Sequence, residues 1–439
     1  MHRNGLAGVV LLLLALSACA RSSRRGNGAS GFTTIAATIS DPARNQVYVG
    51  DATSGRVVAI SATTGDPVRE ILLGSTIGGM ALDHCFRQLY VGVTGGLRID
   101  VVDADTFQRT ASLRLGTGVY ALAAGLDGHL LAVTGRGLLD LALATLQTTT
   151  LKAAVDRDAL LCTDRLTTRA FLIEEDGGEI VVSCFDLTQL GALHQTSAPG
   201  AMAGRPVGAA VSFDGATLWV ATDGADGVYR LDAATLQVIE AIDAGPGLAA
   251  MATTTTGTRM YVSRGDPLVQ SLNLDTYAAG RDVIAAADVA ERGVHVAPNN
   301  LGLVLHGEDG SISSYATFDV GFDVPTALRQ GGDYTATIQG TPHAPWYLFM
   351  SLAPGYIYLD PPTAPDPRFL DLSLADAFRV LNFGVFDAAG RAQLVETIPT
   401  DVPATVDFVV QVAEAPPIGF AAIEVSNPLV VRFLGPDCN

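Results

Sequence analysis

The chain repeats itself with a period of about 42 residues over most of its length. Each copy has an apolar strand, a turn rich in Asp, Gly, Asn or Thr, and a second apolar strand that ends in a Tyr-Val-like pair. The equivalent residues of the second strands are separated by 42, 42, 40, 47, 42 and 42 positions and are Val49, Val91, Val133, Ile173, Val220, Val262 and Val304. A period of ~40–45 residues is typical of four-stranded propeller blades, which bury their faces by packing against their neighbours. Seven copies therefore predict a seven-bladed β-propeller over residues 32–320.

The second half of each repeat also keeps a pattern. Third strands end near Asp-x-x-Thr, as in Asp103-Ala104-Asp105-Thr106, and an outer strand follows. Together with strand ends such as Tyr48-Val49-Gly50 and Tyr90-Val91-Gly92, the pattern resembles the YVTN family of β-propeller repeats, which occurs in extracellular and surface proteins. The resemblance implies the fold but no activity, because propellers host binding, scaffolding and several chemistries.

The seventh copy of the repeat is incomplete. Its first three strands are expected at Val294–Ala297, Gly302–Leu305 and Ser311–Phe318, and no fourth strand follows. Propeller rings are usually closed by a strand from the other terminus. The residues before Phe32 are few and polar, which makes them a poor candidate, so the sequence leaves the closure of the ring open.

The composition changes after Asp319, where the period stops and prolines become frequent. Short strand-like runs separated by turn signals recur over residues 321–439, and this spacing predicts a β-sandwich. Segments such as Phe386-Asp387-Ala388-Ala389-Gly390-Arg391 and Ser426-Asn427-Pro428 are similar to a C-terminal sandwich domain common in secreted proteins of environmental Gram-negative bacteria. We therefore expect an all-β chain in which the propeller is followed by a separable C-terminal β-sandwich that brings no known activity.

Residues 1–18 have the features of an export signal. A short basic start precedes the apolar run Leu6–Leu16, which is too short to span a bilayer because a spanning helix needs ~20 residues. The stretch Leu16-Ser17-Ala18-Cys19 resembles the lipobox of bacterial lipoproteins, which implies cleavage before Cys19 and its acylation, for example with palmitate. Ala20, where an Asp would retain a lipoprotein at the inner membrane, implies the outer membrane. Residues 19–31 would then be a flexible tether; the alternative is an ordinary cleaved signal with an incidental cysteine.

The net charge limits the classes of partner that the chain can bind, and the cysteines bear on whether disulfides form. The formal net charge of −18 excludes a nucleic-acid partner, because phosphate binding needs a basic surface. Besides Cys19 there are four cysteines, and their spacing matches no Cys-x-x-Cys metal or redox motif. Cys162 and Cys184 would have one strand between them, roughly 9–10 Å, which is too far for a disulfide. An even count in an exported protein permits disulfides, but we expect buried free thiols at Cys85, Cys162, Cys184 and Cys438.

One group of carboxylates has the composition of a cation site. Glu174, Glu175, Asp176 and Glu179 surround Gly177-Gly178, and oxygen ligands of this kind can hold Ca²⁺. The spacing lacks the Asp-x-Asp-x-Asp-Gly order of a dedicated loop, so a solvated hairpin is the competing interpretation.

No cofactor is expected elsewhere. Residues 116–121 match Gly-x-Gly-x-x-Ala, but the dinucleotide motif requires a helix after it, and here the glycines recur at the blade junctions. His295 is expected on an innermost strand that can face the channel, and His306 ends the next strand. No His-x-His or His-Glu-x-x-His spacing occurs, and no nucleophile elbow is present.

The sequence thus predicts a cell-envelope lipoprotein that binds or scaffolds through its propeller loops without catalysis. Its ligand would be a protein or a carbohydrate. The alternative is a lactonase-like propeller hydrolase with polar groups gathered around the channel mouth, using His295 or His306 and a divalent cation. An enzyme would show converging His, carboxylate and Arg groups in one deep pocket.

Overall fold

The structure is a computed structural model of the whole chain. It describes residues 24–26, 32, 34–83, 85–126, 128–189, 192–197, 200–265, 268–277, 283–284, 291–300, 302–307, 312–317, 320–359, 369–374, 378–398, 407–415, 423–434 and 438. These residues are almost entirely strands and turns, with one short 3₁₀ turn at η1 (Leu187–Gln189). The described part contains no helix with the length and apolarity that a bilayer span requires.

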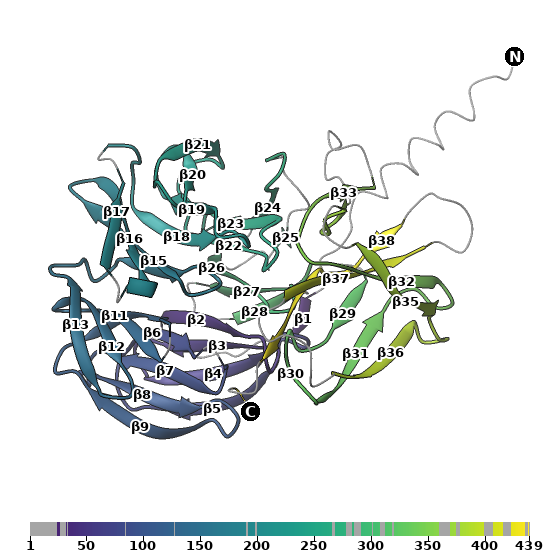
Figure 1. Cartoon of the computed structure of the whole chain (residues 1–439), viewed down its shortest axis with the longest axis horizontal. Coiled ribbons are helices and arrows are strands. Elements are labelled where there is room, and N and C mark those ends of the chain that lie inside the picture. The colour runs from purple at the N-terminus through teal and green to yellow at the C-terminus, as the bar shows by residue number, and fades with distance from the viewer. Residues whose placement is uncertain are drawn as a thin grey trace, which may run out of the picture.

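The repeat region folds into four-stranded antiparallel sheets, of which the described residues form seven (Figure 1). The first three sheets consist of β2 (Ile35–Asp41), β3 (Gln46–Asp51), β4 (Arg56–Ser61) and β5 (Pro67–Leu72); β6 (Ile77–Leu82), β7 (Gln88–Val93), β8 (Arg98–Asp103) and β9 (Gln108–Arg114); and β10 (Val119–Ala124), β11 (His129–Thr134), β12 (Gly137–Ala142) and β13 (Gln147–Lys152). The next two consist of β14 (Leu160–Thr163), β15 (Arg169–Asp176), β16 (Glu179–Asp186) and β17 (Ala192–Thr196); and β18 (Pro206–Val211), β19 (Thr217–Thr222), β20 (Gly227–Asp232) and β21 (Val238–Asp243). The last two consist of β22 (Ala250–Thr253), β23 (Arg259–Ser263), β24 (Leu268–Asn273) and β25 (Val283–Ile284); and β26 (Glu291–Val296), β27 (Gly302–Gly307), β28 (Ile312–Ala316) and β1 (Arg24–Gly26).

The sequence period corresponds to one position in each sheet. The seven Val and Ile residues that mark the period all lie on the second strands of their sheets and are fully buried. Outer strands such as β9, with the sequence Gln-Arg-Thr-Ala-Ser-Leu-Arg, are exposed along almost their whole length. Apolar residues therefore occupy the strands that neighbouring sheets cover, and polar residues occupy the strand that faces solvent.

The recurrent Asp-x-x-Thr pattern caps a turn. Oδ1 of Asp103 accepts hydrogen bonds from the backbone N of Asp105 at 3.1 Å and of Thr106 at 2.7 Å. Oδ1 of Asp232 accepts the equivalent hydrogen bonds from the backbone N of Ala234 at 2.9 Å and of Thr235 at 2.7 Å. The repeat keeps Asp at this position because its side chain satisfies amides that the turn leaves unpaired.

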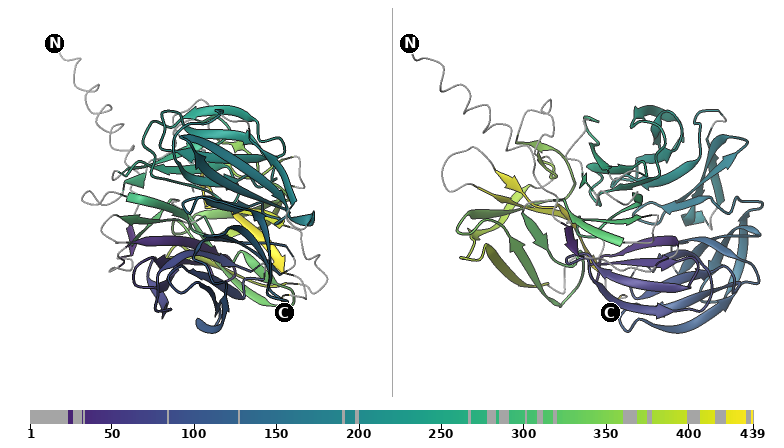
Figure 2. Two further views of the ribbon diagram at one scale, coloured as in Figure 1. Left: turned by 90° about the vertical axis from the view of Figure 1, so that its left-hand side faces the viewer. Right: turned by 180° about the vertical axis from the view of Figure 1, so that it is seen from behind.

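The sheets are arranged as a β-propeller. Contacts join the innermost strands in the order β2, β6, β10, β14, β18, β22 and β26. The last of these strands returns to the first, since Nε2 of His295 on β26 lies 2.7 Å from Oγ of Ser40 on β2. Figure 2 shows the same ring from behind and from one side.

The ring is closed by the strand nearest the N-terminus. Strand β1 pairs antiparallel with β28, with Arg24 opposite Tyr315 and Gly26 opposite Ser314. It supplies the fourth strand that the last repeat lacks. The expectation that residues before Phe32 are a poor source of this strand is therefore wrong. Backbone hydrogen bonds at a sheet edge do not require apolar side chains.

The C-terminal region forms further sheets beside the propeller (Figure 1). A three-stranded sheet contains β29 (Gly321–Asp323), β31 (Asp333–Gln339) and β36 (Arg391–Thr397). A larger sheet contains β30 (Ala327–Arg329), β39 (Leu429–Leu434), β37 (Asp407–Glu414), β32 (Pro345–Ser351), β35 (Arg379–Val385) and β38 (Glu424–Val425). A two-stranded sheet contains β33 (Ile357–Tyr358) and β34 (Phe369–Leu370).

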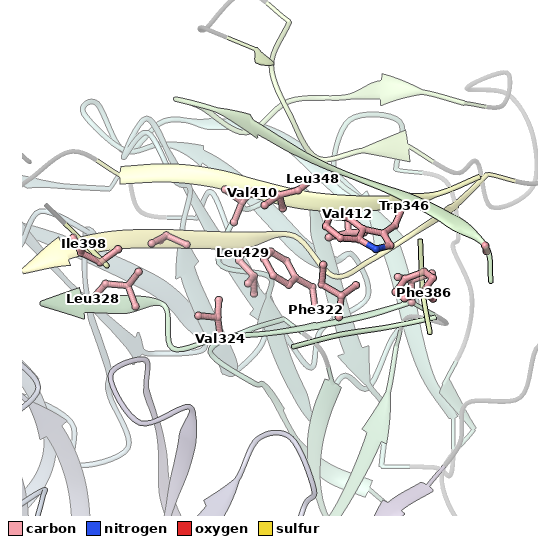
Figure 3. Packing of buried hydrophobic residues seen from close by; sticks show 14 residues of the cluster. Phe322, Val324, Leu328, Trp346, Leu348, Phe386, Ile398, Val410, Val412 and Leu429 are labelled. Carbon is pink, nitrogen blue, oxygen red and sulfur yellow. The ribbon is translucent and has the colours of Figure 1, made fainter. Parts of the chain in front are cut away.

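One apolar core joins the two larger sheets of this region (Figure 3). Phe322 and Ile338 come from the three-stranded sheet, while Trp346 and Val412 come from the larger one, and all four are buried. Every buried member of this cluster lies between residues 320 and 431. The C-terminal region thus has an apolar core of its own.

Candidate functional site

Two cavities of the described residues lie against the innermost strands of the propeller, along what we call its channel. One has a volume of about 660 Å³ and lies where β2, β6, β10 and β14 begin. The other has a volume of about 830 Å³ and lies where the same strands end. Only the second cavity is also lined by residues of the C-terminal region. We call them the open-end cavity and the closed-end cavity.

The open-end cavity has a polar rim. Tyr120, Arg157, Asp158 and Arg205 contribute to its lining. Arg205 and Asp158 are both 61% exposed, and their charged atoms are 3.9 Å apart, a separation at which an exposed ion pair contributes little to stability. Arg157 is also exposed. This rim therefore offers charged groups of both signs to a partner.

The C-terminal region forms part of the wall at the closed end. Phe433, Leu434 and Cys438 line the cavity there, and Cys438 forms a disulfide with Cys85, with Cα atoms 5.2 Å apart. The expectation of free thiols at Cys85 and Cys438 is therefore wrong. A sequence separation of 353 residues gives no spacing from which this pairing can be inferred.

Cys162 and Cys184 lie on two strands that have one other strand between them, as the sequence predicts. Cys162 on β14 and Cys184 on β16 both pair with Phe171 on the strand between them, and both are free thiols. Burial raises the pKa of Cys162 to about 12 and that of Cys184 to about 11. Neither thiol is therefore an activated nucleophile at neutral pH.

Buried polar side chains also bind the C-terminal region to the propeller. Nδ2 of Asn427 donates to the carbonyls of Asn299 at 2.6 Å and of Phe322 at 2.7 Å, and its Oδ1 accepts from the amide of Phe322 at 2.8 Å. Thr258 donates to the carboxylate of the fully buried Asp371, whose pKa is raised by burial. These contacts and the disulfide attach the C-terminal region to the propeller.

His295 contacts two hydroxyl groups of β2, and His306 lies near enough to affect its titration. Nδ1 of His295 lies 3.3 Å from Oγ1 of Thr38, and its Nε2 contacts Ser40. Burial lowers the pKa of both histidines to about 4, and His306 contributes to the shift of His295. Both side chains are therefore neutral at pH 7. Across the described residues, no group of three or more His, Cys, Asp or Glu side chains could hold a metal ion.

The four carboxylates proposed for Ca²⁺ are not brought to one point. Glu174 is buried, accepts from Nζ of Lys152, and accepts from the backbone N of Asp156 at 3.2 Å. Glu175, Asp176 and Glu179 are exposed at a two-residue hairpin turn, where Gly177 and Gly178 have φ values of 64° and 89°.

The glycine-rich stretch from Gly116 lies between β9 and β10, at a junction of two sheets. Gly116 has a φ of 67°, and the corresponding junction residues Gly74 and Gly245 have φ values of 73° and 77°. A positive φ explains why glycine recurs here, since other residues adopt this conformation at a cost. The lipidation site Cys19 and the signal at residues 1–18 lie outside the described residues.

The structure also brings together charged residues that the sequence analysis does not identify. Arg165, in the turn after β14, and Arg432 on β39 both pair with Asp407 on β37 at the wall of the closed-end cavity. No local spacing marks these residues, because the carboxylate and one arginine belong to the C-terminal region and the other arginine to the propeller.

Comparison with known proteins supports the fold and little more. No family model matches the sequence, and no curated protein matches it either. Among solved structures, 1276 chains resemble this one, so the fold is a common one. The β-propeller domain of Cps50 (Swd1) from Myceliophteria thermophila has a TM-score of 0.56 at 12% identity, and the match covers 67% of this chain and 99% of that chain. At this identity the likeness shows the propeller fold alone.

Proposed function

We propose that the chain is a lipoprotein of the cell envelope, anchored at the outer membrane, that acts as a non-catalytic binding module. The propeller fold suggests a protein-binding or scaffold module. The observation that carries the proposal is the asymmetry of the channel. Its own C-terminal region lines one end, and the rim with Arg157, Asp158 and Arg205 lies at the other. The partner, a protein or a carbohydrate, binds at this rim.

The binding face can be tested by site-specific photocrosslinking in cells that express the full chain. A photoreactive residue at Arg157 is expected to give a discrete crosslinked product. The matched control at Thr149, which is exposed on the outer strand β13, is expected to give none. Crosslinking of equal intensity from both positions would place the binding face elsewhere.

The anchor is tested separately. Cys19→Ala is expected to release the protein from the membrane fraction and to abolish labelling with palmitate, because covalent lipid provides the attachment. A variant that remains membrane-bound and labelled would refute the lipid anchor without bearing on the binding face.

Catalysis is tested with a panel of sugar and acyl lactones in the presence of divalent cations. We expect no turnover. Metal-dependent hydrolysis that disappears in His295→Ala or His306→Ala would show that the channel is an active site of the lactonase type instead.

A further inference from the structure

The closed-end cavity has the size and wall of a binding site for a small molecule. Its volume of about 830 Å³ lies within the range of ~300–1,000 Å³ that is usual for ligand pockets. Most of its wall is apolar and comes from Met80, Leu82, Leu122, Leu161, Phe433 and Leu434. The cavity also lies between two structural regions, where ligand sites are frequent.

One part of this wall carries two guanidinium groups that share a single carboxylate. Arg165 pairs with Asp407, and Nε of Arg432 lies 3.1 Å from Oδ1 of the same residue. The side chains of the two arginines are 22% and 27% exposed, while that of Asp407 is 8% exposed. Arg165 additionally packs on the ring of Phe213, 3.9 Å from its centroid. The single carboxylate of Asp407 is therefore the shared partner of two guanidinium groups.

The other carboxylates of the cavity are satisfied within their own turns. Oδ1 of Asp83 accepts from the backbone amides of Arg87 at 2.6 Å and Gln88 at 3.0 Å. Asp164 accepts from the amide and the hydroxyl of Thr168 at 2.7 and 2.6 Å. Asp164 also pairs with Arg169 at 3.5 Å, so within the cluster of Arg165, Arg432 and Asp407 two guanidinium groups face one carboxylate. Burial lowers the pKa of both arginines, and the nearby positive charge of Arg432 lowers the pKa of Arg165 further.

We propose that the closed-end cavity binds an amphipathic anion, a single carboxylate head on an unbranched apolar chain. The head pairs with Arg165 and Arg432, because a guanidinium presents two parallel N–H donors to a carboxylate. The apolar chain lies along the wall formed by the innermost strands. This inference depends neither on the lipid anchor nor on a partner at the open end.

The closed-end cavity adjoins the open-end cavity. The two share the lining residues Thr38, Met80, Leu122, Leu161 and Cys162, all on innermost strands.

The test uses calorimetric titration of the full chain carrying Cys19→Ala, which is purified without detergent. Dodecanoate is expected to bind with one-to-one stoichiometry, and uncharged dodecanol at least tenfold more weakly. Arg432→Met and Arg165→Met are each expected to weaken dodecanoate binding roughly 10–100-fold, as expected for loss of a charged hydrogen-bonding group, and to change dodecanol binding less than twofold. Arg114→Met, on the exposed outer strand β9, is the matched control and should leave both affinities unchanged.

Two further variants keep the outcome interpretable. Arg432→Lys retains the charge and should bind dodecanoate more tightly than Arg432→Met does. Ala124→Phe fills the cavity from β10 and should abolish binding of both ligands while unfolding stays cooperative. The proposal is overturned if dodecanoate fails to bind, if dodecanol binds equally well, or if the folded arginine variants bind dodecanoate like the unmodified protein.

Discussion

Nε2 of His295 and Oγ of Ser40 lie 2.7 Å apart, although the two residues are 255 positions apart in the sequence. This contact joins the innermost strand of the last sheet to that of the first. Its environment keeps the imidazole neutral, because burial and the neighbouring His306 lower the pKa of His295 to about 4. The seam of the ring therefore depends on the protonation state of a histidine.

Acid is expected to destabilise the protein through this seam. An unfolded histidine takes up its proton near pH 6.5, whereas His295 and His306 do so near pH 4 in the folded state. Between these values the unfolded state binds more protons, so the free energy of unfolding falls as the pH falls from 6.5 to 4, by about 1–3 kcal/mol per histidine. Urea unfolding at pH 7 and pH 4.5 measures this loss.

The double variant His295→Gln, His306→Gln should have a smaller loss of stability between the two pH values. His343→Gln, which replaces an exposed histidine, is the control. An unchanged pH dependence in the double variant would contradict the assignment.

Loss of the disulfide is expected to lower stability because Cys85 and Cys438 close a loop over a sequence separation of 353 residues. Cys438→Ser should reduce the free energy of unfolding by about 2–5 kcal/mol. Cys162→Ser, which removes a free thiol, should cost less. Thiol titration of the unfolded Cys19→Ala chain should find two reactive groups before reduction and four after it. Four groups without reduction would show that the bond does not form.

Asn427 is expected to stabilise the C-terminal region through Phe322 and its contact with the propeller through Asn299. Its fully buried side chain makes three hydrogen bonds to the backbone of Asn299 and Phe322. Asn427→Ala leaves these groups unsatisfied and should cost about 2–4 kcal/mol. Asn382→Ala removes a side-chain oxygen that accepts from the amide of Phe383, the next residue on the exposed strand β35, and should change stability by less than about 0.5 kcal/mol. Equal effects in thermal unfolding would contradict this role.

Strand β35 is expected to promote self-association. It lies at the edge of the larger C-terminal sheet and carries no charged residue after Arg379, while Phe383 and Val385 are 72% and 63% exposed. A long apolar edge strand without a charge is a template for pairing with another strand. Phe383→Lys should shift the onset of association in sedimentation velocity to higher concentration without loss of stability. Thr149→Lys adds the same charge on β13 and should not; a similar shift in both variants would mean that charge alone is responsible.

The propeller could be predicted because its information is local and repeated. Val49, Val91 and the five equivalent residues reveal the period, and each lies at the same place in its sheet. Closure of the ring could not be predicted in the same way. Arg24 and Gly26 pair through backbone groups, which leave no trace in the choice of side chains.

The candidate sites, too, could be predicted only where the information is local in the sequence. The cysteine geometry of Cys162 and Cys184 was accessible from strand order alone. The Cys85–Cys438 bond and the pairing of Arg165 with Asp407 depend on how the C-terminal region sits on the channel. Neither the period of the repeat nor any short motif contains that information.

The place of β1 has a consequence for the order of assembly. This strand is synthesised before every other strand described here, and its partner β28 is the last strand of the repeat region. A growing stack of sheets has two ends, each with an apolar face that only the next sheet can cover. Those two faces meet only when the final repeat has been made, so a nascent chain carries a pair of unpaired apolar surfaces through most of its synthesis. Chaperones that shield such surfaces would be needed for longest at the sheet formed by β2–β5, whose free face waits for β26–β28.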